Sequence, residues 1–239
     1  MSVLVIAGLD SSGGAGVLRD CAVLAEHGLT ARVAVTAVTA QGAMGVTALH
    51  PVPPAVVAAQ IAAAGPVRAI KSGMLANAGI VRAVARALPP GIPFVLDPVL
   101  AASSGADLLD AAGRAALLQH LLARATLITP NLPEAAQLTG LPEAMDDDTR
   151  HATAAALFAM GVRAVLLKGG HGLGPLAVDW LLRPGQPPLA FSAPRLPNGK
   201  RGTGCTLATA LTVALAQGAD LPEACAIARE YLQRWLGAA

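Results

Sequence analysis

Short runs rich in Val, Ile and Leu alternate along the chain with longer runs rich in Ala and Leu. The short runs are typical of buried strands and the Ala-rich runs of helices. Strands are predicted at residues 3–6, 32–38, 69–72, 94–96, 126–128 and 162–167. Helices are predicted at residues 13–26, after a glycine-rich turn, and at 54–64, 80–88, 108–122, 149–160, 205–217 and 222–236. The alternation predicts an α/β fold with a mostly parallel sheet covered on both faces.

Two segments near the end of the chain depart from this alternation. Residues 176–182 and 189–192 are predicted to be antiparallel strands joined by a turn at Arg183-Pro184-Gly185. The 239 residues contain no clear linker, repeat or low-complexity block. We therefore expect residues 1–239 to form a single domain, a three-layer αβα sandwich around a mostly parallel central sheet.

Composition argues against several classes of function. The net charge is only +2, no Lys/Arg run occurs, and aromatic residues make up 3% of the chain, so a nucleic-acid partner is not expected. Gly, Pro, Asp or Arg interrupts each apolar run before it reaches membrane-spanning length. Residues 1–6 carry no basic leader and are interpreted as a first strand.

The cysteines indicate the compartment. Cys21, Cys205 and Cys225 are odd in number, far apart and form no C-x-x-C motif. A disulfide framework or a zinc site is not expected, and the pattern favours the reducing cytoplasm.

Polar and glycine residues follow the predicted strands. In parallel sheets ligands bind beyond the carboxyl ends of the strands, so these residues are candidates for a site. They are Gly8-Leu9-Asp10, Gln41, Gly73-Met74, Asp97-Pro98, Asn131 with Glu134, and Lys168-Gly169-Gly170.

Taken one at a time, these motifs leave alternatives open. Asn131 and Glu134, three residues apart, could order water around Mg²⁺ or form a helix capping box. Asp97 could face a metal or a phosphate, or simply belong to an Asp-Pro turn. Lys168 could reach a phosphate or be a solvated charge. The glycines between residues 7 and 16 could admit a ligand to the backbone or form a tight turn.

Cys205 follows Gly202, Thr203 and Gly204 at the start of a predicted helix. Free N–H groups at such a start bind anions, and the positive helix end favours a thiolate. Cys205 is therefore a candidate base, although a small core residue in the first turn would give the same pattern. A cysteine hydrolase is not favoured, because no histidine has a telling place in the sequence.

Seven motifs in order give the chain a resemblance to a known family. They read "AGxDxSGGAG … TAVTAQ … KSGM … LDPV … TPNxPE … KGGH … GTGCT", from Ala7 to the last helix. This order resembles hydroxymethylpyrimidine/phosphomethylpyrimidine kinase of thiamine biosynthesis, in the ribokinase-like superfamily. The resemblance implies ATP- and Mg²⁺-dependent phosphorylation of 4-amino-5-hydroxymethyl-2-methylpyrimidine, and then of its monophosphate to the diphosphate.

The resemblance also implies roles for individual residues. Gln41 would hold the aminopyrimidine edge. The other residues expected to line the pyrimidine pocket are Gly8, Ala15, Asp20, Met74 and Val99. Asn131 and Glu134 would organise Mg²⁺ and the phosphates, with Asp97 nearby. The expected nucleotide-binding residues are Lys168, Gly169, Gly170 and Thr203. The anion hole would run from Gly202 through Gly204 to Cys205, with Cys205 near the substrate hydroxymethyl group.

The chain departs from the family pattern at Arg201, where a histidine is usual. We expect Arg201 to contact a transferring phosphate as a bidentate donor. A pyridoxal/pyridoxine kinase and a non-catalytic pyrimidine-binding paralogue are the alternative functions. The resemblance implies a homodimer and leaves a requirement for a monovalent cation open.

Overall fold

The computed structural model describes residues 1–42, 45–102, 105–170, 174–196 and 200–238. Its centre is a nine-stranded sheet with the order β3-β2-β1-β4-β5-β6-β7-β8-β9. The strands are β1 (Ser2–Asp10), β2 (Thr30–Gly42), β3 (Gly45–Pro51), β4 (Ala69–Ser72), β5 (Phe94–Leu96), β6 (Leu127–Ile128), β7 (Val165–Leu167), β8 (Leu176–Leu182) and β9 (Leu189–Pro194). The strands from β2 through β1 to β7 run parallel, and β3, β8 and β9 are antiparallel to their neighbours.

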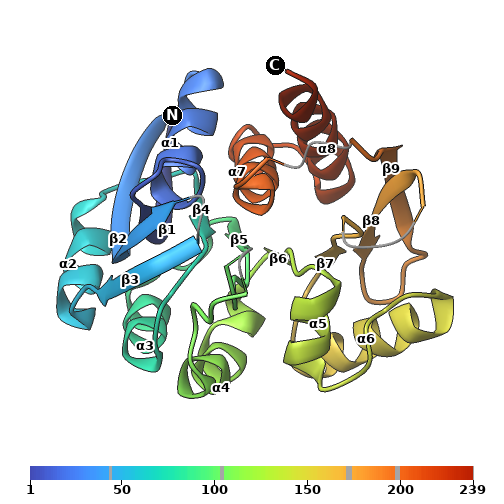
Figure 1. Ribbon diagram of the computed structural model, residues 1–239, viewed down its shortest axis with the longest axis horizontal. Coiled ribbons are helices and arrows are strands. Elements are labelled where there is room, and N and C mark those ends of the chain that lie inside the picture. Colours follow the sequence, from blue (N-terminus) through green and yellow to red (C-terminus); the bar gives the residue numbers. More distant parts are fainter. Residues whose placement is uncertain (43–44, 103–104, 171–173, 197–199, 239) are drawn as a thin grey trace.

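Helices cover both faces of the sheet (Figure 1). On one face lie α1 (Gly16–Glu26), α7 (Thr203–Ala216) and α8 (Leu221–Gly237). On the other lie α2 (Pro54–Ala63), α3 (Ala78–Ala87), α4 (Ala111–His120), the short helix η1 (Leu122–Arg124), α5 (Leu132–Thr139) and α6 (Asp147–Ala159). This arrangement confirms the predicted α/β fold with its layered, mostly parallel sheet.

The hydrophobic core follows these layers. The helices α2 to α6 bury one large cluster against the sheet, which includes Ile70 and Leu96. The helices α1, α7 and α8 bury separate clusters on the other face, which include Val5 and Val95. Successive residues of a strand point to opposite faces, so each central strand contributes to both cores. This explains why the central strands read as continuous apolar runs.

Several element boundaries differ from the sequence prediction. The structure extends β2 to Gly42 and adds the unpredicted strand β3, so Gln41 lies within a strand rather than beyond its end. Helix α4 begins only after Asp110, whose side chain caps it. Helix α7 begins two residues earlier than predicted, at Thr203. The antiparallel hairpin of β8 and β9 is confirmed. His171, to which the sequence assigns no role, lies outside the described residues.

No helix among the described residues is both long enough and apolar enough to cross a membrane.

Candidate active site

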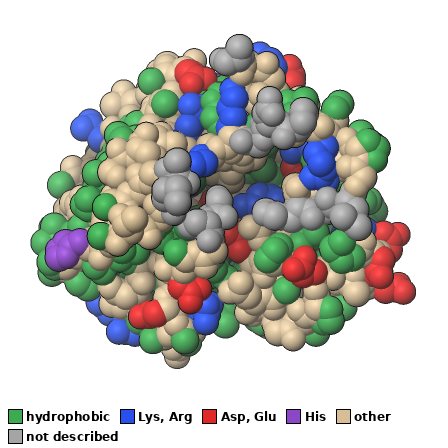
Figure 2. All heavy atoms as spheres, in the orientation of Figure 1, with side chains coloured by type: hydrophobic (Ala, Val, Ile, Leu, Met, Phe, Trp, Pro, Cys, Tyr) green, Lys and Arg blue, Asp and Glu red, His purple; other side chains and the backbone are tan. Residues whose placement is uncertain are grey.

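A cavity of about 650 Å³ opens at the carboxyl ends of the parallel strands, beside the start of α7. Figure 2 shows this face hollowed near its centre, with lysine, arginine and acidic side chains inside the hollow. Fifteen predicted site residues line the cavity: Gly8, Ala15, Gln41, Met74, Asp97, Val99, Asn131, Glu134, Lys168, Gly170, Arg201, Gly202, Thr203, Gly204 and Cys205. The fold thus joins motifs that are up to two hundred residues apart.

Two predicted residues do not line the cavity. Asp20, expected on the pyrimidine pocket wall, is fully buried behind it. Gly169, expected beside the nucleotide, packs against β8, because a Cβ there would lie 1.9 Å from the carbonyl oxygen of Val178. Its N–H donates to Asp179 at 2.9 Å. Both residues support the wall of the cavity rather than form its surface.

Gln41 is fixed at one end of the cavity by the loop after β1. Its backbone N–H donates to Ser11 Oγ at 2.9 Å, and Ser11 Oγ donates to its carbonyl oxygen at 3.2 Å. Thr39 Oγ1 lies 3.4 Å from the side-chain oxygen of Gln41. Gln41 lines the same cavity as Gly8 and Met74.

A buried charge cluster lies deeper in the cavity. Lys168 Nζ is 2.8 Å from Asp97 Oδ1 and 3.8 Å from Glu134 Oε2. Thr129 Oγ1 donates to Asp97 Oδ1 at 3.0 Å. Burial raises the pKa of Asp97, but Lys168 and Lys71 outweigh it and lower that pKa below its usual value. Burial raises the pKa of Glu134 to about 7. One carboxylate is thus permanently charged, and the other titrates near neutrality.

Asn131 and Glu134 form the capping box that begins α5. Asn131 Oδ1 accepts from the N–H of Glu134 at 2.7 Å, and Glu134 Oε2 accepts from the N–H of Asn131 at 2.8 Å. The capping alternative is therefore confirmed, and the box holds Glu134 towards Asp97 and Lys168.

The oxygen atoms of Asp97, Asn131 and Glu134 are the type of ligand that Mg²⁺ prefers. Among the described residues no group of three or more His, Cys, Asp or Glu side chains could enclose a metal. Mg²⁺ usually keeps several waters and takes one or two carboxylates plus substrate phosphates. The pair Asp97 and Glu134 fits that mode, while the amide oxygen of Asn131 is already used by the cap.

The start of α7 forms an anion cradle, made of Gly202, Thr203, Gly204 and Cys205. Gly202 has φ of 77°, and a Cβ there would lie 2.2 Å from the carbonyl oxygen of Gly14. In the first hydrogen bond of the helix, the N–H of Thr206 donates to the carbonyl oxygen of Gly202. The preceding N–H groups have no partner within the helix, so they can donate to an anion.

The protonation state of the half-buried Cys205 thiol differs from the sequence expectation. Burial raises its pKa to about 11, and the positive charge of Lys71 opposes this shift only in part. The helix start alone would favour a thiolate, but removal from water favours the neutral form and has the larger effect. The site at rest therefore holds a thiol.

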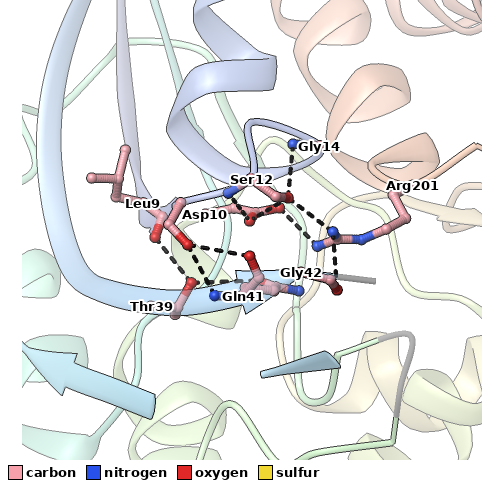
Figure 3. Close-up of polar contacts among 9 residues, drawn as sticks. Leu9, Asp10, Ser12, Gly14, Thr39, Gln41, Gly42 and Arg201 are labelled. Carbon is pink, nitrogen blue, oxygen red and sulfur yellow. Dashed lines mark hydrogen bonds and ion pairs between the residues drawn. The ribbon is translucent and has the colours of Figure 1, made fainter. Parts of the chain in front are cut away.

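Arg201, the residue before the anion cradle, binds Asp10 and Ser12 at the end of β1 (Figure 3). Its Nη2 lies 2.8 Å from Asp10 Oδ2, and its Nη1 donates to Ser12 Oγ at 2.9 Å. Asp10 Oδ1 in turn accepts from the N–H and the hydroxyl of Ser12. We call this group the Arg201 clasp. Protein oxygens accept from both terminal nitrogens, so Arg201 ties the loop after β1 to the start of α7, and its contact with a transferring phosphate stays a prediction.

Sequence reasoning missed several residues that line the cavity. Asp179 on β8 and Arg229 on α8 lie in the wall 3.1 Å apart, beside Arg195, which follows β9. Lys71 on β4 also borders the cavity. Its sequence signal is a lysine directly after Ala69 and Ile70 in a central strand, where charged residues are rare.

The parallel sheet, the anion cradle and the buried cations define a ribokinase-like α/β phosphotransferase. The family model described as phosphomethylpyrimidine kinase matches residues 10–239. The chain belongs to the phosphomethylpyrimidine kinase family, which confirms the resemblance seen in the sequence.

Individual relatives agree with this assignment. The hydroxymethylpyrimidine/phosphomethylpyrimidine kinase of Mycobacterium tuberculosis is 44% identical over 99% of this chain and 88% of its own length. The crystal structure of phosphomethylpyrimidine kinase from Clostridium difficile has a TM-score of 0.84 and 32% identity, covering 98% of this chain and 99% of that one. Pyridoxal kinase from Staphylococcus aureus, in complex with AMP-PCP and pyridoxal, has a TM-score of 0.87 and 30% identity, covering 98% of this chain and 87% of that one.

Proposed function

We propose that the protein transfers the γ-phosphoryl group of ATP first to 4-amino-5-hydroxymethyl-2-methylpyrimidine and then to its monophosphate, in thiamine diphosphate biosynthesis. The proposal is carried by one observation: Gln41 and the anion cradle line the same cavity. A ring bound near Gln41 and Met74 would direct its hydroxymethyl group towards Cys205. The kinases of this name that are over 40% identical support the choice of substrate.

The chain supplies positioning and charge, which are the main needs of phosphoryl transfer. The N–H groups of the anion cradle would receive the transferring group, and Lys168 would stand beside it. Bound Mg²⁺, held through water by Asp97 and Glu134, would neutralise phosphate charge. The far end of the cavity, bordered by Arg195, Asp179 and Arg229, would take the rest of the nucleotide.

The two transfers make different demands on Cys205. In the first, the alcohol must lose a proton as its oxygen bonds to phosphorus, and we assign that proton to the minor thiolate form of Cys205. The high pKa makes this thiolate scarce but strongly basic. In the second, the nucleophile is a phosphate oxygen that is already ionised, so no base is required.

A pyridoxal kinase is the second candidate, because the Staphylococcus aureus pyridoxal kinase shares this fold along nearly the whole chain. The discriminating experiment is a coupled ADP-release assay with the alcohol, its monophosphate and pyridoxine as separate substrates. We expect turnover of both pyrimidines at kcat/KM well above that of pyridoxine. Preference for pyridoxine, or pyrimidine binding without ADP release, would refute the proposal.

We further propose that residues 1–239 act as one kinase domain in a cytoplasmic homodimer. The three cysteines are free thiols, which suits a reducing compartment. Val38 and Val56 leave 44% and 47% of their surfaces exposed on β2 and α2, and a partner could cover them. Sedimentation of the protein tests the dimer, and the assay above with K⁺ exchanged for a larger cation tests the monovalent ion requirement.

A further inference from the structure

Lys71 is a lysine in the centre of the sheet. It lies on β4, paired with Val5 of β1 and Val95 of β5, and its side chain is fully buried. Its neighbour Ile70 belongs to the core beneath α2 to α6, so Lys71 points to the opposite layer, towards α1 and α7. A lysine is almost never fully buried unless it is paired.

The partner of Lys71 is Asp20 on α1. Asp20 Oδ2 lies 2.7 Å from Lys71 Nζ, and Asp20 Oδ1 accepts from Thr209 Oγ1 on α7 at 2.8 Å. Burial opposes the ammonium, but Asp20, Cys205 and Asp97 together outweigh it, Asp20 most, and raise the pKa of Lys71. Burial also raises the pKa of Asp20, against Lys71 and Thr209. The short contact and the donation from Thr209 both fit an ionised carboxylate, so we treat the pair as charged.

Stability alone does not account for such a pair. Well-packed apolar residues of similar volume stabilise a core as well as a buried ion pair or better, because both charges must leave water. The pair also constrains its surroundings: a Cβ on Gly73 would lie 3.0 Å from Lys71 Nζ. The presence of this buried ion pair is therefore weak evidence for a role in stability alone.

The pair adjoins the cavity that Cys205 lines. Thr209 is one helical turn beyond Cys205 on the same face of α7. Lys71 borders the same cavity as Cys205 and the anion cradle. Four charged groups act on the thiol: Lys71 from β4, Asp20 from α1, Asp97 after β5 and Lys168 after β7. Among them, Lys71 is the main influence that favours negative charge at Cys205.

We propose that Lys71 is a positioning residue of this site, whose permanent buried charge, anchored by Asp20 and through it by Thr209, favours negative charge at Cys205 and in the anion cradle. The kinetic part of this proposal rests on the proposed function. The part that concerns Cys205 does not, because the reactivity of a thiol is measurable without turnover.

The test removes the charges while keeping the packing. The double variant Lys71→Met/Asp20→Asn retains the approximate size of both side chains and leaves no unpaired buried charge. Its control is Arg150→Met/Asp147→Asn, which removes an ion pair of 2.6 Å on α6, away from the cavity. Lys71→Met alone leaves Asp20 without its cation and is expected to fold poorly.

The first readout is alkylation of Cys205 by iodoacetamide at about pH 8, followed by mass spectrometry of the Cys205 peptide. We expect the double variant to melt close to the wild type and to label about tenfold more slowly, as a rise of about one unit in the thiol pKa would produce. The control should label at the wild-type rate. A folded double variant that labels at the wild-type rate overturns the proposal.

Thr209→Val separates charge from placement, because it breaks the bond to Asp20 and keeps the ammonium. We expect its labelling rate to stay close to that of the wild type. If it slows labelling as much as the double variant does, placement of the helix explains the effect and the charge assignment is wrong.

The second readout is turnover. We expect the double variant to lose at least about tenfold in kcat for the first phosphorylation, with KM for ATP little changed. Unchanged kcat in a folded double variant overturns the kinetic part. If the wild type turns over neither pyrimidine, the proposed function fails, and the labelling result still decides the role of Lys71.

Discussion

Single residues in the cavity differ most in whether they carry charge at neutral pH. Asp97 is held ionised by Lys168 and Lys71, and Glu134 titrates near pH 7. Cys205 rests as a thiol because burial outweighs the cations around it. These three protonation states determine how each residue can serve phosphoryl transfer, and each can be tested by substitution.

Replacing Cys205 by alanine should damage the two phosphorylations unequally. We expect the first to lose about 10²-fold or more in kcat and the second much less, because only the alcohol needs a base. In the wild type, the first step should also accelerate with pH from about 6 to 9 as thiolate forms. Single-turnover assays with each substrate measure both effects. Equal losses would make Cys205 a packing residue.

Replacing Arg201 by alanine opens the Arg201 clasp. Asp10, which is almost fully buried, would lose its cation, and the loop before α1 would lose its tie to α7. We expect KM for the pyrimidine to rise severalfold with a smaller change in KM for ATP. Steady-state kinetics measure this, with the exposed Arg32→Ala on β2 as a control. A selective loss of ATP affinity would instead indicate direct phosphate contact.

Glu134 should make stability depend on pH. Its pKa rises from 4.5 in the unfolded chain to about 7 in the fold. Between these pH values the folded state binds one proton more than the unfolded chain. The contribution of this proton to the free energy of unfolding is complete below pH 4.5. It is lost as the pH rises through 7, and amounts to about 3 kcal/mol.

Chemical denaturation of the wild type and Glu134→Gln between about pH 5 and 8 tests this. The variant keeps an acceptor for the cap but cannot titrate. We expect it to gain stability relative to the wild type as the pH rises. A constant difference between the two proteins would show that Glu134 is ionised throughout.

At the scale of helices and strands, the start of α7 depends on a backbone contact. Gly202 has a positive φ, and its Cα faces the carbonyl oxygen of Gly14. Gly28 has a similar φ of 69° but no atom within 4 Å of an added Cβ. An alanine at either position would suffer the strain of a positive φ. Only at residue 202 would its Cβ also collide with another atom.

We expect Gly28→Ala to cost about 1 kcal/mol and to leave kcat unchanged. Gly202→Ala should cost more and reduce kcat, because the loop before α1 must move away from the anion cradle. Denaturation midpoints and turnover of both variants measure this. Similar costs with equal activity would show that the contact between Gly14 and Gly202 is unimportant.

The sequence predicted most elements because their apolar runs are long and clearly bounded. It failed where tertiary contacts decide. The strand β3 lies at the sheet edge, and only its first residue is buried, so its apolar signal is weak. Asp20 looked like a solvated carboxylate because nothing local shows that Lys71, 51 residues away, buries it.

At the scale of the whole molecule, the order of strands brings the site together. The predicted residues at the strand ends meet because β1, β4, β5, β6 and β7 are parallel neighbours. Pattern and spacing predicted which residues meet. They could not predict the protonation state or the hydrogen-bond partners of each residue in the site, as the burial of Cys205 and the Arg201 clasp show. Solvent exclusion and contacts between distant segments determine those properties.

The central claim is that one cavity adds two phosphates in succession to a pyrimidine alcohol. Phosphorus NMR of a mixture of the protein, MgATP in excess and 4-amino-5-hydroxymethyl-2-methylpyrimidine tests it most directly. We predict that a phosphate monoester appears first and is then converted to a diphosphate, with two ADP formed per pyrimidine. Absence of any pyrimidine phosphate, under conditions in which the same protein phosphorylates pyridoxal, would contradict the account.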